Sequence, residues 1–255
     1  MVPRMNFLVT AGATTDPIDR ARSVVPATPA RFGPALARTA AARGHRVTLL
    51  TSDPDGAGAG GEAVTVVPYG TFADLSAALE QLVTGGSYDA ICHTAAVASF
   101  LPAGTYTPAP DTRFNTRTRQ FEASVREATF HPHPSSADDD TEIEFWVRMT
   151  RTPRLIDRLR SQLDFAGLLV KFKTTVGSED EKLIEAAEVS RLKSSADLIV
   201  LNTWDSARQW AFVGPVDGRY DRVPRREVAD RVVLSVEHVT RQARNSAEFR
   251  KPSPT

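Results

Sequence analysis

The chain has 255 residues, of which 41% are hydrophobic, enough to bury the core of one large α/β domain. Lysine plus arginine and aspartate plus glutamate number 31 each, so no overall positive field favours nucleic acid or an anionic membrane. The single cysteine, Cys92, cannot form an internal disulfide, and no apolar run reaches membrane-spanning length. We therefore expect a cytoplasmic protein.

Short apolar runs and amphipathic segments alternate along the chain. Residues 7–10 predict a strand that ends at the Ala11-Gly12 turn, and residues 33–44 predict a helix that stops at Gly44. The later elements are predicted, in order, as strands over 46–51 and 63–68, a helix over 72–83, a strand over 88–94, a helix over 154–163, a strand over 168–173, a helix over 179–190, a strand over 197–202 and a helix over 228–242. The alternation predicts an α/β fold, a Rossmann-like and mostly parallel sheet with helices on both faces.

Two segments interrupt this alternation. Residues 102–140 are rich in Pro, Thr, Arg and Asp, and we expect them to protrude as a flap or a dimerisation arm, followed by a strand-like run over 142–149. The polar residues 241–255 are expected to be disordered. We interpret residues 1–240 as a single nucleotide-binding domain.

Several residues near the predicted strand ends are candidates for a binding site. The segment TAGATT after the first strand is either a close approach for a phosphate or an ordinary tight turn, and it is not the G-x-G-x-x-G fingerprint. Lys171 and Lys173 alternate along a predicted strand and so lie on one side of it, with Phe172 on the other. This pair indicates either a bound phosphate or lysines whose charged ends reach solvent.

Other patterns favour no special chemistry. Arginines interleave with phenylalanines over 113–126, but the zero net charge favours a flap over a nucleic-acid surface. His131, His133 and residues 138–140 could together bind a metal, yet no spaced Cys or His completes a ligand set, and we predict no metal site. Cys92 lies in a predicted buried strand, which favours an inert thiol.

Taken together, an ordered set of motifs resembles the phosphopantothenoylcysteine synthetase family, also called phosphopantothenate cysteine ligases. The motifs are TAGATTDPID, the G-x-x-x-A helix start after Phe32, ARGHRVTLLTS, TAAVASFLP, LLVKFKTTVG and SSADLIVLNT, spread over nearly all of residues 6–240. The resemblance implies a homodimer that acts in coenzyme A biosynthesis. CTP or ATP, with Mg²⁺, activates the phosphopantothenate carboxylate as an acyl nucleotide with loss of pyrophosphate, and cysteine then attacks. The segments FKTTVG and VLNTWDSARQWAFVG are more similar to standalone members than to those fused behind a decarboxylase.

The resemblance also implies site residues. Those matching the family's nucleotide pocket are Gly12, Ala95, Ala96, Val97, Pro153, Leu155, Phe172 and Asn202. The family's substrate loop, I-S-N-x-S-S-G-x-x-G, matches residues 24–33, which include Thr28, Arg31 and the surviving Gly33.

Two departures separate the sequence from the family pattern. Pro26 stands where the family has the asparagine that holds the substrate, and proline has neither a side-chain amide nor a backbone N–H. Residues 102–140 contain no lysine, although the family's flap carries one that stabilises charge on the activated phosphate. Arg113 of the flap, or Lys171 and Lys173 of the sheet, could replace that charge, and these three are the candidate catalytic residues.

We predict a phosphopantothenate cysteine ligase-like enzyme that acts on small molecules and binds neither nucleic acid nor a membrane. The alternatives are a catalytically impaired or regulatory nucleotide-binding homologue and a ligase for a different carboxylate. An NAD-dependent Rossmann enzyme is disfavoured because the dinucleotide fingerprint is absent, although Asp53 lies near the position of its acidic residue.

Overall fold

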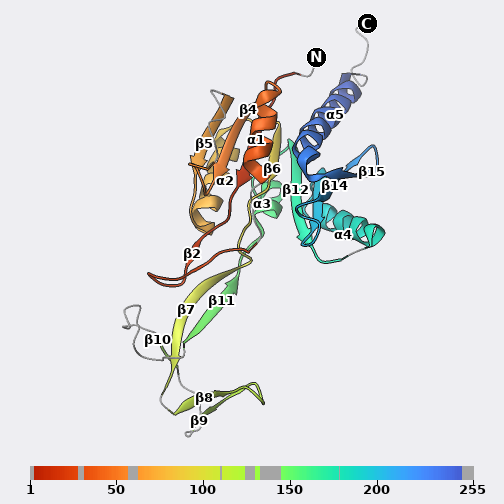
Figure 1. Ribbon diagram of the computed structural model, residues 1–255. Coiled ribbons are helices and arrows are strands. Elements are labelled where there is room, and N and C mark those ends of the chain that lie inside the picture. Colours follow the sequence, from red (N-terminus) through yellow and green to blue (C-terminus); the bar gives the residue numbers. More distant parts are fainter. Residues whose placement is uncertain are drawn as a thin grey trace. The chain divides into compact units, whose positions relative to one another are not determined.

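The computed structural model describes residues 3–27, 32–56, 63–109, 111–123, 130–132, 145–177 and 179–248 (Figure 1). The chain divides into two compact units. The first unit comprises Met1–Thr14, Ala27–Val97 and Arg154–Thr255, and the second comprises Thr15–Pro26 and Ala98–Pro153. The excursion that the sequence predicts over 102–140 therefore lies inside a larger unit of its own.

The first unit is built on an eight-stranded sheet with the order β15-β14-β13-β12-β6-β1-β4-β5. Its strands are β1 (Asn6–Ala11), β4 (Arg46–Thr51), β5 (Val64–Pro68), β6 (Ala90–His93), β12 (Leu168–Thr175), β13 (Leu198–Thr203), β14 (Trp210–Val216) and β15 (Arg219–Pro224). All neighbours from β5 to β13 are parallel, and β14 and β15 add an antiparallel hairpin at one edge. The predicted mostly parallel α/β sheet is confirmed.

Helices cover both faces of this sheet. On one face, α1 (Phe32–Ala42) and α5 (Val228–Glu248) share a core cluster with β1, β4, β12 and β13. On the other face, α4 (Asp180–Lys193) packs against Ile199 and Leu201. From β1 the chain proceeds through β4 to the edge strand β5, and from β5 it proceeds in the opposite direction through β6, β12 and β13. Right-handed crossovers therefore place α2 (Phe72–Gly85) and α3 (Leu155–Ser161) on the same face as α4.

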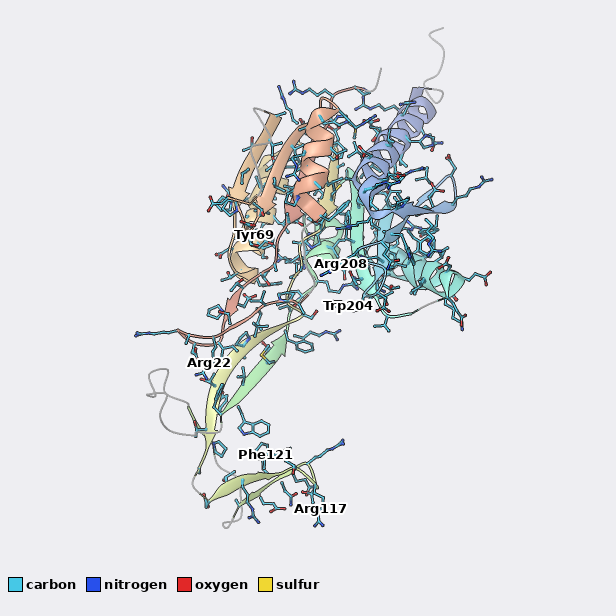
Figure 2. All side chains as sticks on the ribbon, in the orientation of Figure 1. Arg22, Tyr69, Arg117, Phe121, Trp204 and Arg208 are labelled. Atoms are coloured by element: carbon cyan, nitrogen blue, oxygen red, sulfur yellow. The ribbon has the colours of Figure 1, made fainter. Side chains whose placement is uncertain are left out.

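The second unit consists of short antiparallel strands. β7 (Phe100–Pro108) pairs with β10 (Phe130–Pro132) and with β11 (Trp146–Arg151), β2 (Asp16–Pro17) pairs with β3 (Ser23–Val24), and β8 (Thr112–Asn115) pairs with β9 (Gln120–Ala123). The rings of Phe114, Phe121 and Trp146 form a cluster with centroids 4.8–5.0 Å apart. Figure 2 shows Phe121 and Arg117 on the β8–β9 hairpin. The second unit thus contains packed aromatic rings, although the composition of residues 102–140 is mainly polar.

Two local predictions differ from the structure. We expected the last helix to end at Gln242 and residues 241–255 to be disordered, but α5 continues to Glu248, and residues 249–255 lie outside the described part. Residues 241–248 contain no Gly or Pro, so nothing in them ends a helix. The β14–β15 hairpin was missed, although its two-residue Asp217-Gly218 turn, with φ of +49° and +75°, is a strong hairpin signal.

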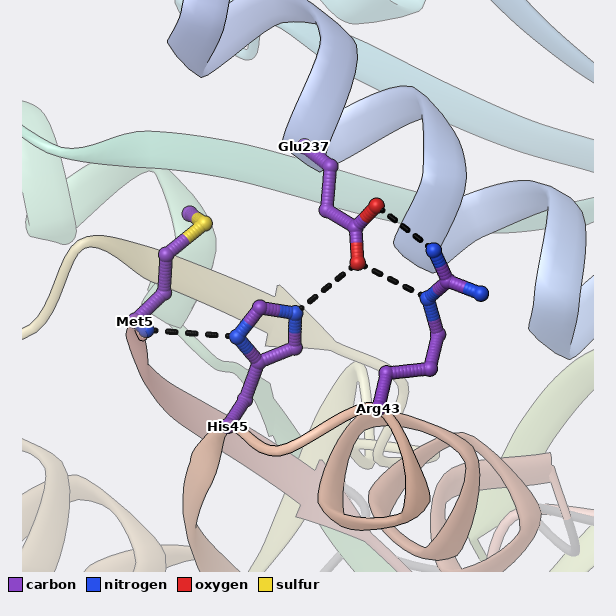
Figure 3. Close-up of polar contacts among 4 residues, drawn as sticks. All are labelled: Met5, Arg43, His45 and Glu237. Carbon is purple, nitrogen blue, oxygen red and sulfur yellow. Dashed lines mark hydrogen bonds and ion pairs between the residues drawn. The ribbon is translucent and has the colours of Figure 1, made fainter. Parts of the chain in front are cut away.

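A buried carboxylate of α5 binds the short segment between α1 and β4, at the amino end of that strand (Figure 3). Glu237 is 3% exposed and accepts hydrogen bonds from Arg43 Nε and Nη2, both at 2.8 Å, and from His45 Nε2 at 3.0 Å. The Met5 N–H donates to His45 Nδ1 at 3.2 Å, so the proton of the neutral imidazole lies on Nε2. The hydrogen bonds from Arg43 are the main reason that the pKa of Glu237 is lowered.

We expect Glu237→Gln to lower the free energy of unfolding by about 2 kcal/mol at neutral pH, because charge-assisted hydrogen bonds in a buried site are lost. Urea denaturation measures this. A lowered carboxyl pKa stabilises the fold above the unfolded value of about 4.3, so the difference between the two proteins should shrink as the pH falls below that value. Glu227→Gln, in an exposed pair with Arg226, is the control and should change stability by less than about 0.5 kcal/mol.

Candidate functional site

The strand order places a topological switch point between β1 and β6. The chain leaves β1 toward β4 and later returns to β6 on the other side of β1, so the connections diverge there. Thr10 lies opposite His93, and His93 lies opposite Lys171, in one row across β1, β6 and β12. Gly12 therefore directly follows β1, Ala95 lies two residues after β6, and Phe172 lies within β12, one residue beyond the row that Lys171 shares with His93. The three candidates are close to one edge of the sheet. Open parallel sheets bind their ligands at such an edge.

The turns that follow β1 and β6, here called the switch-point turns (residues 12–14 and 94–97), are tightly packed. Gly12 has a φ of +80°, and a Cβ at this position would lie 2.1 Å from Ser52 Oγ. The N–H of Ala13 donates to Ser52 Oγ at 2.9 Å. Ala96 N donates to Gly12 O at 2.9 Å, and Thr14 N donates to Ala96 O at 3.1 Å. The turns thus continue the pairing of the strands beyond β1 and β6.

The side chains beneath these turns form a neutral network. The Thr10 hydroxyl accepts the Ala95 N–H at 3.1 Å and lies 3.1 Å from His93 Nδ1, to which it can donate its own hydrogen. Burial and then the charge of Lys171 lower the pKa of His93 to about 4, so its imidazole is neutral at physiological pH. The hydroxyl of Tyr69, which is labelled in Figure 2, donates to Ala11 O at 2.7 Å, and burial raises its pKa to about 12.

The first turn of α1 packs directly against the same edge. A Cβ on Gly33 would lie 2.4 Å from Ala11 Cβ and 2.8 Å from Thr94 Oγ1, so only glycine lets the helix come this close. The Phe172 ring lies on the face of the sheet that α1 covers, with its centroid 5.2 Å from that of Phe32. Phe172 is therefore both a candidate nucleotide contact and part of the packing of α1.

Lys171 and Lys173 lie on the face of the sheet that α4 covers, opposite to Phe172, as their alternation predicts. Their environments differ. Lys171 is 4% exposed, and its Nζ donates to Ser190 O at 2.6 Å and to Ser194 Oγ at 2.5 Å. It thereby ties β12 to the last turn of α4. Burial and then the charge of Arg154 lower its pKa to about 8. Lys173 instead lines an open cleft.

This cleft, called the basic cleft below, has a volume of about 520 Å³. It is lined by Arg154, Lys173, Lys182, Glu185, Ala186, Val189, Ser190 and Lys193. Four of these side chains are cationic and one is a carboxylate, so the cleft has an excess of positive charge. It can attract an anion at the carboxyl end of β12.

The other predicted site residues are distributed as follows. Leu155 is buried in the core, and Asn202 accepts a hydrogen bond from Thr174 Oγ1 at 2.8 Å. Pro26, Pro153 and Arg113 belong to the second unit, where the side chain of Arg113 is 82% exposed and pairs with Glu122 at 3.2 Å. Thr28 and Arg31 lie outside the described residues.

Sequence reasoning missed several residues of this edge. Ser52 and Tyr69 directly follow the carboxyl ends of β4 and β5, and His93 is the last residue of β6. The position of a polar residue just after a predicted parallel strand is the signal that could have found them. Asp53, which an NAD enzyme would use for ribose, instead accepts the Gly56 N–H of its own loop at 2.9 Å.

The described residues contain no group of three or more potential metal ligands. His133 and residues 138–140, which the sequence singled out, lie outside that part of the chain. Among the helices of the described residues, none is both long enough and apolar enough to cross a membrane.

We expect Gly12→Ala to lower the free energy of unfolding by about 2–4 kcal/mol, because a left-handed backbone and a collision with Ser52 are combined. Gly44→Ala is the matched control. Gly44 has a φ of +90° but no atom within 4 Å of an added Cβ, so only the backbone cost of about 1–2 kcal/mol applies. Equal losses in urea denaturation would contradict the packing of the switch-point turns.

The buried amine of Lys171 should give stability a pH dependence. Because its pKa is about 8 in the folded protein and about 10.4 in the unfolded chain, the unfolded state binds more protons between these values. The stability of the wild type relative to Lys171→Met should therefore increase, by about 2–3 kcal/mol, as the pH rises from 8 to 10.4. Parallel urea titrations of the two proteins measure this difference, and a constant difference would contradict it.

Comparisons with known proteins agree with this architecture. Residues 3–108 match the family model of the DNA/pantothenate metabolism flavoprotein C-terminal domain. The coenzyme A biosynthesis bifunctional protein CoaBC of Thermococcus kodakarensis (strain ATCC BAA-918 / JCM 12380 / KOD1) is 27% identical over 235 residues, which are 90% of this chain and 50% of that protein. The chain thus spans about half the length of this curated relative.

Solved structures share the fold. The DNA/pantothenate metabolism flavoprotein from Streptococcus pneumoniae has a TM-score of 0.69 and 22% identity, with 91% of this chain and 98% of that chain covered. The C-terminal domain of CoaBC has a TM-score of 0.64 and 21% identity, with 93% and 96% covered. A Cab2 mutant in complex with phosphopantothenate-cysteine has a TM-score of 0.62 and 14% identity, with 97% and 89% covered. The predicted resemblance of this chain to the phosphopantothenoylcysteine synthetase family is therefore confirmed.

Proposed function

We propose that this protein is a ligase of coenzyme A biosynthesis that joins phosphopantothenate to cysteine through an acyl nucleotide. The observation that carries the proposal is the set of switch-point turns, where Gly12 and Ala95 follow two adjacent strands and Phe172 lies within the next strand, β12, of a sheet whose fold matches that of the relatives. The name of the curated relative and the ligand of the Cab2 complex point to the same chemistry.

In the proposed first step, a carboxylate oxygen of phosphopantothenate attacks the α-phosphorus of a nucleoside triphosphate. The bond to the β-phosphate oxygen breaks, and pyrophosphate leaves. In the second step, the amine of cysteine attacks the acyl carbon, a proton is lost to solvent, and the nucleoside monophosphate leaves. Both steps transfer a group between bound small molecules, so positioning and charge stabilisation are the main tasks of the protein.

The switch-point turns would hold the mononucleotide. Gly12 and Ala95 are partly buried residues of these turns, and the start of α1 directs the positive end of a helix dipole to the same edge. In this proposal Ala96, Val97 and Asn202 complete the nucleotide pocket together with Phe172, whereas the buried side chain of Leu155 supports the start of α3 from the core. Thr10 and His93 position the turn after β6.

Charge on the phosphates would be neutralised by cations that lie beside β12 in the first unit. Lys173 lines the basic cleft, whereas the Nζ of Lys171 is already bound to α4. Mg²⁺ would enter with the nucleotide phosphates, because the described residues offer no cage of three ligands. We also propose, from the resemblance, a cytoplasmic homodimer that uses CTP or ATP.

A second candidate function is a nucleotide-binding homologue without turnover. Pro26 in place of the substrate-holding asparagine favours it, as does the absence of lysine from residues 102–140. A protein of this kind would keep the pocket at the carboxyl ends of the strands and lack the groups that stabilise charge during the reaction.

The test is to incubate the purified protein with phosphopantothenate, cysteine, Mg²⁺ and either CTP or ATP and to measure pyrophosphate. The ligase should release pyrophosphate only when a carboxylate is present. Nucleotide-induced thermal stabilisation without pyrophosphate would instead support the second candidate.

A substitution in the loop over residues 24–33 gives a more specific test of the ligase. Pro26→Asn should raise the rate of pyrophosphate release by about 100-fold, because one preorganised hydrogen-bond donor is restored. Val25→Asn places the same amide one residue away on an exposed position and should leave the rate unchanged. If both variants behave like the wild type, residue 26 does not contact the substrate.

A further inference from the structure

One arginine of the first unit lacks the partner that comparable arginines have. Four arginines of the described residues are partly buried. Three of them, Arg158, Arg160 and Arg191, each pair with a carboxylate at 2.5–3.6 Å. The fourth, Arg225, forms no ion pair within the part of the chain that the structure describes, and burial lowers its pKa. A cation that has lost water without gaining an acidic partner is stabilised by an incoming anion.

Arg225 lies at the same edge of the sheet as the switch-point turns. Because β14 is antiparallel to both β13 and β15, β15 points in the direction of the parallel strands, and Arg225 directly follows its carboxyl end. The Arg225 guanidinium lies over the Phe32 ring, 4.7 Å from its centroid. Phe32 precedes Gly33, which brings α1 into contact with Ala11 and Thr94. The unpaired cation is therefore beside the first turn of α1 and close to the switch-point turns.

Backbone contacts hold Arg225 at this position. Its N–H donates to Gln209 O at 2.8 Å. Gln209 belongs to the turn between β13 and β14, in which Thr203 and Ser206 exchange hydrogen bonds of 2.9–3.0 Å. The Phe32 ring attracts the guanidinium but offers it no conventional hydrogen-bond acceptor, so the N–H groups of Arg225 remain available to a ligand.

The surroundings of Arg225 favour a singly charged, planar ligand. The cations of the basic cleft lie on the α4 face of the sheet, whereas Arg225 lies with Phe32 on the α1 face. The nearby side chains of Thr10 and His93 are neutral. One guanidinium balances the charge of one carboxylate, and its paired N–H groups match the two carboxylate oxygens.

The proposed reaction offers two carboxylates. That of phosphopantothenate is consumed in the first step, when it becomes the acyl nucleotide. That of cysteine persists through the second step, and the α-carbon alone separates it from the attacking amine. A carboxylate held at Arg225 would therefore direct the amine toward the switch-point turns, where the acyl nucleotide is proposed to lie.

We propose that Arg225 binds the α-carboxylate of the attacking cysteine and so selects this amino acid over amines that lack a carboxylate. This inference rests on the proposed function, because it assigns the amino-acid subsite of the same ligase. Phe32 is the positioning residue of the subsite, since its ring holds the guanidinium.

Rates of amide formation with cysteine and with cysteamine, which has no carboxylate, test the proposal. The ratio of kcat/KM for cysteine to that for cysteamine should be about 10- to 100-fold higher in the wild type than in Arg225→Met, as expected for charge-assisted hydrogen bonds. Arg225→Lys keeps the charge but not the planar pair of donors and should give an intermediate ratio. The intrinsic reactivities of the two amines cancel when the enzymes are compared, and a purely structural role would change both rates alike.

Pyrophosphate–nucleotide exchange without any amine is the second measurement. It follows the first step alone and should proceed at the same rate in the wild type and in Arg225→Met, which also shows that the variant is folded. If exchange decreases as much as amide formation with cysteine does, Arg225 contacts phosphopantothenate or the nucleotide, and the proposal is wrong.

Arg208→Met is the matched control. Arg208 lies on the turn between β13 and β14 (Figure 2), is exposed and forms no ion pair among the residues that the structure describes. Its loss removes one positive charge from the same edge and leaves Arg225 in place, so the ratio for the two amines should remain that of the wild type. Equal ratios in Arg208→Met and Arg225→Met would overturn the proposal.

Failure of the subsite and failure of the ligase function are distinguishable. Pyrophosphate release with the same amine ratio in the wild type and Arg225→Met would support the ligase and reject the subsite. If no carboxylate gives pyrophosphate, the ligase is rejected, and an NMR titration with L-cysteine decides on the subsite. Binding that Arg225→Met weakens by about 10-fold or more would support the subsite, and binding that is absent or unchanged would reject it.

Discussion

The close approach of α1 to the carboxyl ends of β1 and β6 is the constraint on which the rest of the structure depends. Gly33 allows the first turn of the helix to contact Ala11 and Thr94, and Gly12 allows the turn after β1 to contact Ser52. With the helix and the two turns in contact, backbone N–H groups, carbonyls and hydroxyls at this edge bond to one another. The site is therefore defined by shape and by absence of charge, and the cations lie beside it.

The division between a neutral edge and a charged cleft has a physical basis. A carboxylate or phosphate buried among saturated hydrogen bonds would have no compensating partner, whereas lysines at a strand end keep contact with solvent until an anion arrives. The alternation along β12 sends Lys171 and Lys173 to one face and Phe172 to the other. One strand thus contributes an apolar surface to the α1 side and positive charge to the α4 side.

The parallel core could be predicted from sequence because its strands are short apolar runs separated by helices, a local signal. The excursion and the strand-like run over 142–149, which overlaps β11, were predicted. The strand pairing of the second unit could not be predicted, because β7 and β11 join residues distant in the chain and the aromatic cluster forms only after that pairing. The same limit applies to the lysines. Alternation places Lys171 and Lys173 on one face of the sheet. Only the packing of α4 determines that Lys171 donates hydrogen bonds to Ser190 and Ser194 and that Lys173 lines the basic cleft.

The buried Glu237 network lies where the strands begin, at the end of the sheet opposite the switch-point turns. Folding thus has a strong polar anchor that involves none of the candidate ligand contacts. Substitutions at the candidate ligand-binding edge can accumulate without weakening this network, because the two ends share no side chain. A chain of this design can change which molecule it recognises while its scaffold persists, and the proline-containing loop over residues 24–33 is the kind of alteration that such a scaffold tolerates.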